Sequence, residues 1–549
     1  MSRPVGPVPL ADDRRLAWGL LLLAAGLFVS QCWFAGDATV DDAFFTFSFA
    51  RNLARGHGPV YSHGVRVEGY SAFLWMLVVA VPLALAPATA PLTAARVAGA
   101  PFVLLLGWAT YRMARAAGAA RATAAACVLL LAFDTDLAVA YLTGMETVPF
   151  VALVAVAFAA ALAGPRAPWR AALPYLAVAV ALTRIDGFIA GGFLVAASLL
   201  GLARSDTGCT ARAMARLWLI PAAIYAGWFL WRWRYYGLPL PSTYYAKSAI
   251  ATLLPRRGLE YVADELVGGG LWCALPALPW LLWRQRPAAL VLGGFLFLHL
   301  LYVVQVGGDW MPFGRFVLPV VPPLVVLLGV AAQDLVASAP AGWRRWLAPA
   351  LPLALAAGMA AGRDHRLANG AIERGKLGGV AEQKANVKKY LEAAAFLRQV
   401  IPPGGRLVTD YGGVLSCYTD GALIEMWGLA NSAIATRGSA AGVNPIYGKT
   451  CPDCYAALDP EFFHVGLPLV RPEPAFGSAA EVIAAVWQSD AIGRHVDLTR
   501  FAVGRVRRPA TNEALYFLQK RTPERPLRAR TTRRGFEISY PFEPPEEKR

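Results

Sequence analysis

The stretch Leu16-Ala-Trp-Gly-Leu-Leu-Leu-Leu-Ala-Ala-Gly-Leu-Phe-Val-Ser-Gln-Cys32 decides the class of fold. It is an apolar run long enough to cross the hydrocarbon core of a bilayer. Arg14 and Arg15 stand directly before it, and no small-residue cleavage signal closes it. We therefore expect a retained membrane helix with a cytoplasmic N-terminus.

The composition extends this expectation to the whole chain. Of 549 residues, 57% are hydrophobic and only 16% are charged, which is typical of a polytopic membrane protein. The formal net charge of +16 comes largely from short Lys and Arg clusters between apolar runs. Such clusters mark loops held on the cytoplasmic side, so we expect no nucleic-acid partner.

Further membrane spans are predicted along the first two thirds of the chain, giving about eleven to thirteen helices in all. Treating residues 70–87 as a re-entrant or interfacial segment places every arginine cluster inside; if that segment crosses the membrane, the agreement breaks. The predicted spans cover residues 95–113, 121–140, 147–163, 171–184, 187–203, 217–235, 264–283, 287–306, 316–335 and 346–362.

Two adjacent carboxylates, Asp41 and Asp42, stand in the external loop 36–90 that follows the first span. Ionisable residues at the mouth of a membrane helix are costly, which makes the pair a candidate functional site. An ordinary helix-end charge explains any single polar residue of this kind, whereas a set on one face indicates a site. The same orientation places on that face Asp134, Asp136, Glu146, Arg184, Asp186, Asp309 and the loop 235–247.

The composition changes after residue 362. We predict a transmembrane catalytic domain over residues 1–362 and a soluble external α/β domain over residues 363–549, which is large enough to bury its own core. Cys451 and Cys454 form a CxxC motif in this second part. Because no second motif supplies two more zinc ligands, a local disulfide, or one shared with Cys417, is favoured over a zinc or redox centre.

Six sequence blocks, taken in order, resemble the bacterial GT-C glycosyltransferases that use polyprenyl-phosphate sugars. The last block in particular is similar to the mycobacterial terminal arabinofuranosyltransferases. The resemblance covers roughly residues 16–335, and weakly the external domain. The blocks are Asp41–Gly58, Arg66–Trp75, Thr143–Thr147, Thr183–Gly187, Tyr235–Lys247 and Gly307–Pro319.

This resemblance implies an inverting membrane enzyme with its site on the external face of the bacterial inner (plasma) membrane. The donor is a polyprenyl-phosphate-linked sugar, with a pentose such as arabinofuranose as one candidate, and the acceptor is an envelope glycan or lipid. Two positions depart from the relatives' pattern: Ser242 replaces an asparagine and Ile185 a proline. A different donor or acceptor is therefore open.

The resemblance also assigns roles within the acidic pair. Asp41 is the expected general base, and Asp42 is expected to orient the acceptor or to help hold a divalent cation. Two neighbouring carboxylates suit Mg²⁺ or Ca²⁺, which prefer oxygen ligands. A paired acid motif also works without metal through coupled protonation, so a metal stays an open alternative.

The donor phosphate needs cations, and a charged side chain on the external face can meet an anionic headgroup. Our candidates, in order, are Lys247, Arg184, Arg315, Arg51 and Arg66. The candidates for binding the acceptor or sugar each have an alternative structural role: an ion pair that folds the loop, a turn residue, or an aromatic belt at the membrane surface. These candidates are Glu68, Glu146, Asp309, His57, Tyr244 and Tyr245.

Two other classes of protein stay open from the sequence. A lipid-linked sugar transporter or flippase would place charges near the bilayer midplane and often contains inverted repeats, whereas here the charges lie at helix ends. A non-catalytic envelope assembly protein would not need the acidic pair.

Overall fold

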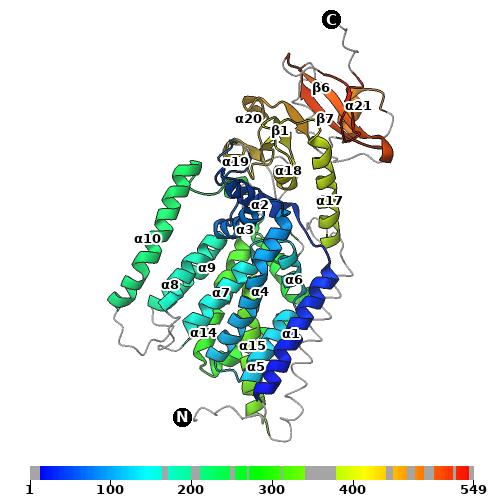
Figure 1. Ribbon diagram of the computed structural model, residues 1–549. Helices are drawn as coiled ribbons and strands as arrows, with labels where there is room; N and C mark the ends of the chain where they lie inside the picture. The colour runs from blue at the N-terminus through cyan, green and yellow to red at the C-terminus, as the bar shows by residue number, and fades with distance from the viewer. Residues whose placement is uncertain are drawn as a thin grey trace.

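A helical bundle carries a smaller domain built around a β-sheet (Figure 1). The computed structural model describes residues 13–62, 64–163, 171–199, 211–247, 254–268, 271–309, 311, 313–340, 379–440, 449–465, 476–486, 500–523 and 527–542. This arrangement confirms the predicted class, a polytopic helical membrane protein with a C-terminal α/β domain. The proposed boundary at residue 362 lies outside the described residues.

Several helices of the bundle are long and apolar enough to span a membrane. By length and composition, the described residues contain 4 such helices, or up to 5 if a bent pair is one span. The four are α1 (Asp13–Ala35), α4 (Pro91–Ala116), α14 (Pro287–Gln305) and the continuous run of η4 (Leu318–Val320) with α15 (Val321–Ser338). The bent pair is α5 (Arg121–Ala132) with α6 (Thr135–Leu142).

The count by this criterion is below the eleven to thirteen spans expected from the sequence. Some apolar helices are shorter than a full span, and the segment 346–362 lies outside the described residues. One predicted span, residues 264–283, is wrong because the chain breaks there into three short helices. The remaining helices of the bundle are α7 (Thr147–Leu162), α8 (Leu173–Thr183), α9 (Gly187–Leu199), α10 (Ala211–Tyr236), α11 (Ser242–Lys247), α12 (Leu254–Gly268), η3 (Leu271–Ala274) and α13 (Ala277–Trp283).

The predicted span 121–140 bends by 62° where α5 meets α6. The cause is local: the side chain of Asp134 accepts a hydrogen bond from the backbone N–H of Asp136 at 3.0 Å and so caps a new helix. A second helix start within the apolar run therefore bends the predicted span.

The core of the bundle is made of small and aromatic side chains. Helix α7 is almost entirely buried, with alanines that let neighbouring helices approach closely and Phe158 packed at 4.6 Å from the ring of Phe295. In contrast, α1 exposes large apolar side chains on its outer face, including Leu22 and Trp33. An outward apolar face of this kind suits contact with lipid.

Helix α3 (Phe73–Leu85) packs along α2 (Asp41–Ala54) at the end of the bundle nearest the sheet-containing domain (Figure 1). It has 13 residues, or about 20 Å, which is too short to cross a bilayer alone. Its residues Leu77, Val81 and Leu85 form an exposed apolar stripe, whereas the opposite side is buried. This geometry fits the re-entrant or interfacial segment expected at residues 70–87.

The C-terminal domain, which the sequence predicts to be soluble and which is called the soluble domain below, is built on a seven-stranded sheet with the strand order β2-β1-β5-β7-β6-β9-β8. Strands β2, β1 and β5 are parallel, and the others pair antiparallel. The strands are β1 (Arg406–Thr409), β2 (Ala422–Glu425), β5 (Phe462–His464), β6 (Phe501–Arg508), β7 (Glu513–Lys520), β8 (Arg530–Thr531) and β9 (Glu537–Ser539), with β3 (Ser439–Ala440) and β4 (Lys449–Thr450) forming a separate pair.

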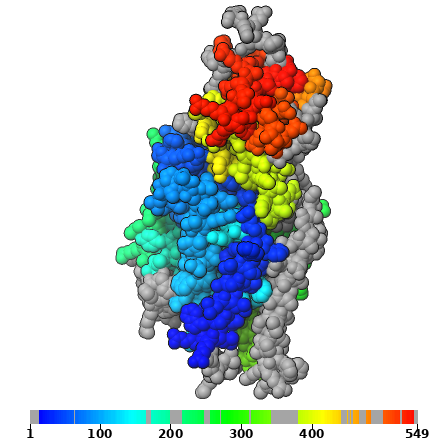
Figure 2. All heavy atoms as spheres, turned by 45° about the vertical axis from the view of Figure 1, so that its right-hand side comes forward, coloured from blue at the N-terminus to red at the C-terminus, as the bar shows by residue number. Residues whose placement is uncertain are grey.

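Helices cover this sheet and join it to the bundle. The space-filling view shows the yellow part of the soluble domain beside the blue N-terminal part of the bundle (Figure 2). Hydrophobic residues from both parts belong to one continuous core cluster, including Phe44, Tyr61 and Leu415. The helices are α17 (Val380–Leu397), α18 (Gly412–Tyr418), α19 (Ser432–Arg437), α20 (Pro452–Ala457) and α21 (Ala479–Val486), with η5 (Pro509–Thr511) before β7.

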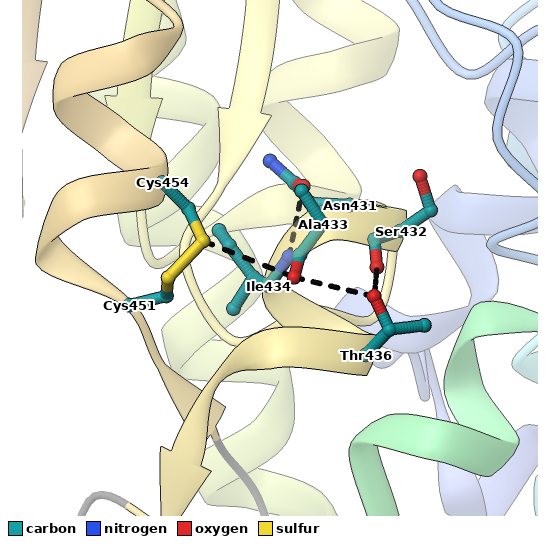
Figure 3. Close-up of a disulfide and its surroundings, with 7 residues drawn as sticks. All are labelled: Asn431, Ser432, Ala433, Ile434, Thr436, Cys451 and Cys454. Atoms are coloured by element: carbon teal, nitrogen blue, oxygen red, sulfur yellow. Dashed lines mark hydrogen bonds between the residues drawn. A yellow bond between two sulfur atoms is a disulfide. The ribbon is translucent and has the colours of Figure 1, made fainter.

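The CxxC motif forms the predicted local disulfide between Cys451 and Cys454 (Figure 3). The bond joins the residue before α20 to a residue in its first turn. It lies next to α19, because the Cys454 sulfur is 3.8 Å from the carbonyl oxygen of Ala433. The alternative partner, Cys417, is a buried free thiol in α18. The motif therefore serves the packing of the soluble domain.

Candidate functional site

The acidic pair occupies the first turn of α2, where the helix dipole favours negative charge. The eight residues that follow, 43–50, are all buried, including Phe44, Phe47 and Phe49. Burial of these aromatic side chains fixes α2 between the membrane bundle and the soluble domain. Asp41 and Asp42 consequently sit on a rigid element at the junction of the two parts.

Asp41 is held by the soluble domain. Its Oδ1 accepts the backbone N–H of Val414 at 2.7 Å, and its Oδ2 accepts that of Gly413 at 3.1 Å, both in the first turn of α18. A side chain at position 413 would meet the carbonyl oxygen of Asp41 at 2.0 Å, so this close approach requires glycine. The hydroxyl of Tyr61 adds a hydrogen bond to the carbonyl of Gly412 at 2.5 Å.

The environment of Asp41 changes its acidity. Burial raises the pKa of this carboxyl to about 7, and the neighbouring charge of Asp42 raises it as well, while the two backbone N–H groups of α18 oppose the shift. A general base works best when its pKa is near the operating pH. The structure therefore gives Asp41 the acidity of a proton acceptor near neutral pH.

The α18 contact is a part of the site that the sequence reasoning missed. The sequence signal was present: the block Val408-Thr-Asp-Tyr-Gly412 ends β1 and begins α18. Nothing in the sequence indicates that the backbone N–H groups after Gly412 reach the carboxylate of Asp41. Gly413 and Asp41 are 372 residues apart in the chain.

Buried ion pairs form the second part of the site. Arg184 follows α8 and donates from Nη1 to Glu146 at 3.0 Å. It also makes a two-point contact with Asp186, at 2.8 Å from Nε and 3.2 Å from Nη2. All three side chains are buried. Two carboxylates around one guanidinium hold the ends of α7 and α8 in register.

A matching pair joins Arg315 to Asp309, both buried, through Nε and through Nη2 at 3.2 Å. One aromatic ring contacts both arginines. The centre of the Phe316 ring lies 5.0 Å from the guanidinium of Arg184 and 5.3 Å from that of Arg315, which are cation–π distances. The negative charge of Asp42 also acts on Arg315. The structure thus brings Asp42, Glu146, Arg184, Asp309 and Arg315 into one neighbourhood.

Two further acids lie beside this cluster. A side chain added at Gly314 would lie 2.5 Å from the carboxylate of Glu265 and 3.1 Å from that of Asp136, so both acids point at the loop before Arg315. Gly314 has φ +52, a conformation that favours glycine. Glu265 escaped the sequence reasoning because it falls inside an expected span that is in fact broken.

The described residues contain no group of three or more His, Cys, Asp or Glu side chains placed to hold a metal ion. Both oxygens of Asp41 accept backbone hydrogen bonds, and Asp42 stands near a guanidinium. These donors do not fit a divalent cation as placed, and we derive no step through a metal.

Several sequence candidates lie elsewhere. Glu68 pairs through both oxygens with Arg232 of α10, which the sequence reasoning had not selected, and not with Arg66. The guanidinium of Arg66 instead lies 5.1 Å from the ring of Tyr235. Near them, the backbone N–H of Ser242 donates to the carbonyl of Glu68 at 3.0 Å. This ion pair anchors the external loop to α10.

The loop 235–247 ends in a short helix, α11. Tyr244 is exposed and its ring lies 5.6 Å from that of Tyr245, edge to face. Lys247 is the last residue of α11, and its side chain lies outside the described residues. The leading phosphate candidate is therefore placed only by its backbone.

The remaining candidates lie at the other end of α2. Ten residues separate Asp41 from Arg51, which is about 15 Å along the helix axis. Arg51 lies 3.9 Å from Asp420 of the soluble domain. His57 is exposed in a turn between Gly56 and Gly58, both at φ +81.

Comparisons with known proteins agree with this architecture. No family model matches the chain. A terminal beta-(1->2)-arabinofuranosyltransferase of Corynebacterium glutamicum is 28% identical over 379 residues, which cover 58% of this chain and 52% of the relative. The chain spans about half the length of that curated protein.

Solved structures match over nearly the whole chain. ArnT from Cupriavidus metallidurans superposes with a TM-score of 0.54 at 14% identity, covering 91% of this chain and 98% of ArnT. The form of ArnT bound to undecaprenyl phosphate gives 0.53 at 14% identity, over 93% and 98%. The oligosaccharyltransferase AglB from Archaeoglobus fulgidus, in complex with an inhibitory peptide and a dolichol-phosphate, gives 0.52 at 12% identity, over 94% and 76%. The resemblance that the six sequence blocks predicted is thereby confirmed, and the chain has the fold of the GT-C glycosyltransferases.

Proposed function

We propose that this chain is an inverting membrane glycosyltransferase that moves a sugar from a polyprenyl-phosphate donor to a cell-envelope glycan or other acceptor. The proposal is supported by the fold it shares with ArnT and AglB, whose structures hold undecaprenyl phosphate and dolichol-phosphate. The observation that carries it is the partly buried carboxyl of Asp41, which stands beside Asp42, accepts two backbone N–H groups of α18 and has its pKa raised to about 7. Such a group is suited to deprotonating an acceptor hydroxyl.

In the proposed reaction, Asp41 takes the proton of the acceptor hydroxyl as its oxygen attacks the anomeric carbon of the donor sugar. The bond from that carbon to the phosphate oxygen breaks, and the lipid phosphate leaves with the electron pair. Asp42 orients the acceptor. Because the leaving group is already a good one, positioning and charge stabilisation account for the rest of the rate.

Arg184 and Arg315 stabilise the leaving phosphate in this proposal, together with Lys247. A guanidinium has five N–H donors. Three nitrogens of each arginine already donate once, those of Arg184 to Glu146 and Asp186, and those of Arg315 to Asp309 and the Met145 sulfur. Within the described part of the chain, two N–H donors on each arginine make no other hydrogen bond and are offered here to the donor phosphate, while the carboxylates fix the guanidinium planes.

We take arabinofuranose as the first donor sugar to test, because the curated relative transfers that sugar. The acceptor is proposed to be an envelope glycan on the external face of a bacterial inner membrane. Ser242 departs from the asparagine of the resembling family, and it is buried beside the Glu68 loop. A change there alters the hydrogen bonds available to sugar or acceptor, so other pentose donors belong in the same assay.

The test is transfer from synthetic polyprenyl-phosphate arabinofuranose to a short arabinan acceptor, followed by mass spectrometry. Asp41→Asn is expected to lower the rate by about 10²–10⁴-fold, the usual contribution of a general base. The matched control is Asp37→Asn, since Asp37 lies in the same external loop, is 81% exposed and pairs with Lys384 at the surface.

A second variant separates catalysis from structure, because Asp41 also binds α18. Asp41→Ala should regain part of its activity when formate is added, since a small carboxylate restores a base but not a covalent tether. Wild-type transfer by a folded Asp41→Asn protein would remove the base assignment. A transporter or scaffold would give no transfer product with any variant, including the wild type.

A further inference from the structure

A cavity of about 400 Å³ opens at the end of α2 opposite the acidic pair. It is formed by the last turns of α2, the loop between α3 and α4, the residue that ends α17 and the last turn of α18. Three arginines line it, Arg51 and Arg55 from the bundle and Arg398 from the soluble domain. The opposite wall is apolar or small, with Leu83, Pro87, Ala90 and Pro91.

The charge in this cavity is poorly balanced by the protein. Arg51 lies 3.9 Å from Asp420, whose side chain is 53% exposed. Within the described part of the chain, neither Arg55 nor Arg398 forms an ion pair with an acidic side chain. Burial lowers the pKa of Arg51, and the charges of Arg55 and Arg398 lower it further. The three cations thus repel one another, and an anion between them would relieve that repulsion.

The cavity also adjoins the apolar surface expected at the membrane. Its Leu83–Pro91 wall continues the end of α3, where Val81 and Leu85 are 58% and 82% exposed. An occupant of this site therefore meets a cluster of arginines at one end and a lipid-facing surface at the other. This combination matches an anionic head attached to an apolar tail.

We propose that this cavity binds the phosphate group of an anionic membrane phospholipid, held by Arg51 and Arg55 of α2 and by Arg398 of the soluble domain. The headgroup thereby bridges the two parts of the chain, and its acyl chains run past Leu83 along the exposed stripe of α3. The site lies about 15 Å along α2 from Asp41. It stands independently of the proposed sugar transfer.

The test uses the full-length protein in nanodiscs of phosphatidylcholine with increasing fractions of phosphatidylglycerol. These synthetic lipids contain no polyprenyl phosphate. Bound phosphatidylglycerol is counted by native mass spectrometry, and thermal unfolding is followed in parallel. The variant Arg55→Gln/Arg398→Gln removes one cation from each part of the chain. The control Arg533→Gln/Arg534→Gln makes the same charge change at an exposed turn before β9.

The wild type is expected to retain phosphatidylglycerol and to unfold at a higher temperature when that lipid is present. The cavity variant should need roughly 30-fold more of it for half-saturation, and the control should behave as the wild type. Equal retention by the cavity variant and the wild type would overturn the proposal. So would an equal thermal shift from inorganic phosphate in pure phosphatidylcholine, which would assign the cavity to free phosphate.

Discussion

The two ends of α2 carry opposite charges and opposite chemistry. At the N-terminal end, the Asp41 carboxylate accepts backbone hydrogen bonds from α18. At the C-terminal end, Arg51 and Arg55 line a cavity whose described lining includes no acidic side chain. Both placements agree with the helix dipole. The two ends differ in the groups that bind their charges. At the acidic end, backbone N–H groups of the protein bind the carboxylate, whereas at the basic end we propose that a lipid phosphate binds the arginines.

The largest expected change in the free energy of unfolding comes from removing one member of a buried ion pair within the protein. Arg315→Met removes the guanidinium that forms the buried ion pair with Asp309, and removal of one member of a buried ion pair typically costs about 3–5 kcal/mol. Arg55→Gln at the basic end should change the free energy of unfolding by less than about 0.5 kcal/mol, because Arg55 is exposed.

Thermal unfolding of the purified protein in detergent measures this difference. Rescue of Arg315→Met by the second change Asp309→Leu would confirm that the loss comes from the buried Asp309 carboxylate that Arg315 no longer neutralises. Equal unfolding temperatures for Arg315→Met and Arg55→Gln would show that the two ends do not differ in the way described.

The second prediction concerns the rate at the acidic end. Asp42→Asn should lower transfer by about 10²-fold, which is the usual result of a misplaced reactant. The loss should appear mainly with weak acceptors, because Asp42 orients the acceptor in our proposal. Steady-state kinetics over a series of acceptors measures this, with Asp37→Asn as the control. An unchanged rate with every acceptor would leave Asp41 as the sole functional member of the pair.

The sequence was sufficient to predict the overall architecture of the molecule. The apolar runs, the arginine clusters and the six ordered blocks led to the helical bundle and the GT-C fold. The CxxC motif led to the disulfide between Cys451 and Cys454. These features are local in the chain or repeated along it, which is why single-sequence reasoning reaches them.

Pairings between distant segments could not be predicted in the same way. Glu68 binds Arg232 at |i−j| = 164, and Gly413 reaches Asp41 at |i−j| = 372. Charge alone offers many partners for each of these groups, and only tertiary packing selects one. The division of the predicted span 264–283 was also missed, because its hydropathy averages over the end of α12, η3 and α13. The arginine cavity depends on Arg398, which no block of the resemblance contains.

The third prediction uses the pKa of Asp41, which is raised from 3.8 to about 7. A base acts in its deprotonated form, so kcat/KM should rise about tenfold per pH unit below pH 7 and level off above it. The folded protein holds this proton between pH 3.8 and 7 while the unfolded chain has released it. The contribution of Asp41 to stability therefore falls as the pH rises through that window.

Transfer rates between pH 5 and 9, together with unfolding temperatures in the same buffers, test both statements. Asp41→Asn should give a residual rate without the inflection near pH 7, and Asp37→Asn should keep it. An inflection that persists in Asp41→Asn would belong to another group and would separate the raised pKa from catalysis.

The smallest effect is expected from Asp420, the acid that lies near Arg51 at the basic end. Asp420→Asn removes the carboxylate 3.9 Å from Arg51. Because the side chain of Asp420 is 53% exposed and lies 3.9 Å from Arg51, the free energy of unfolding should change by less than about 1 kcal/mol. Binding of an anionic lipid should instead tighten by about fivefold, since one opposing charge is lost from the cavity rim. The direction matters most: a weaker retention of phosphatidylglycerol by Asp420→Asn would mean that Asp420 arranges Arg51 for the ligand, and that the protein satisfies charge at both ends of α2.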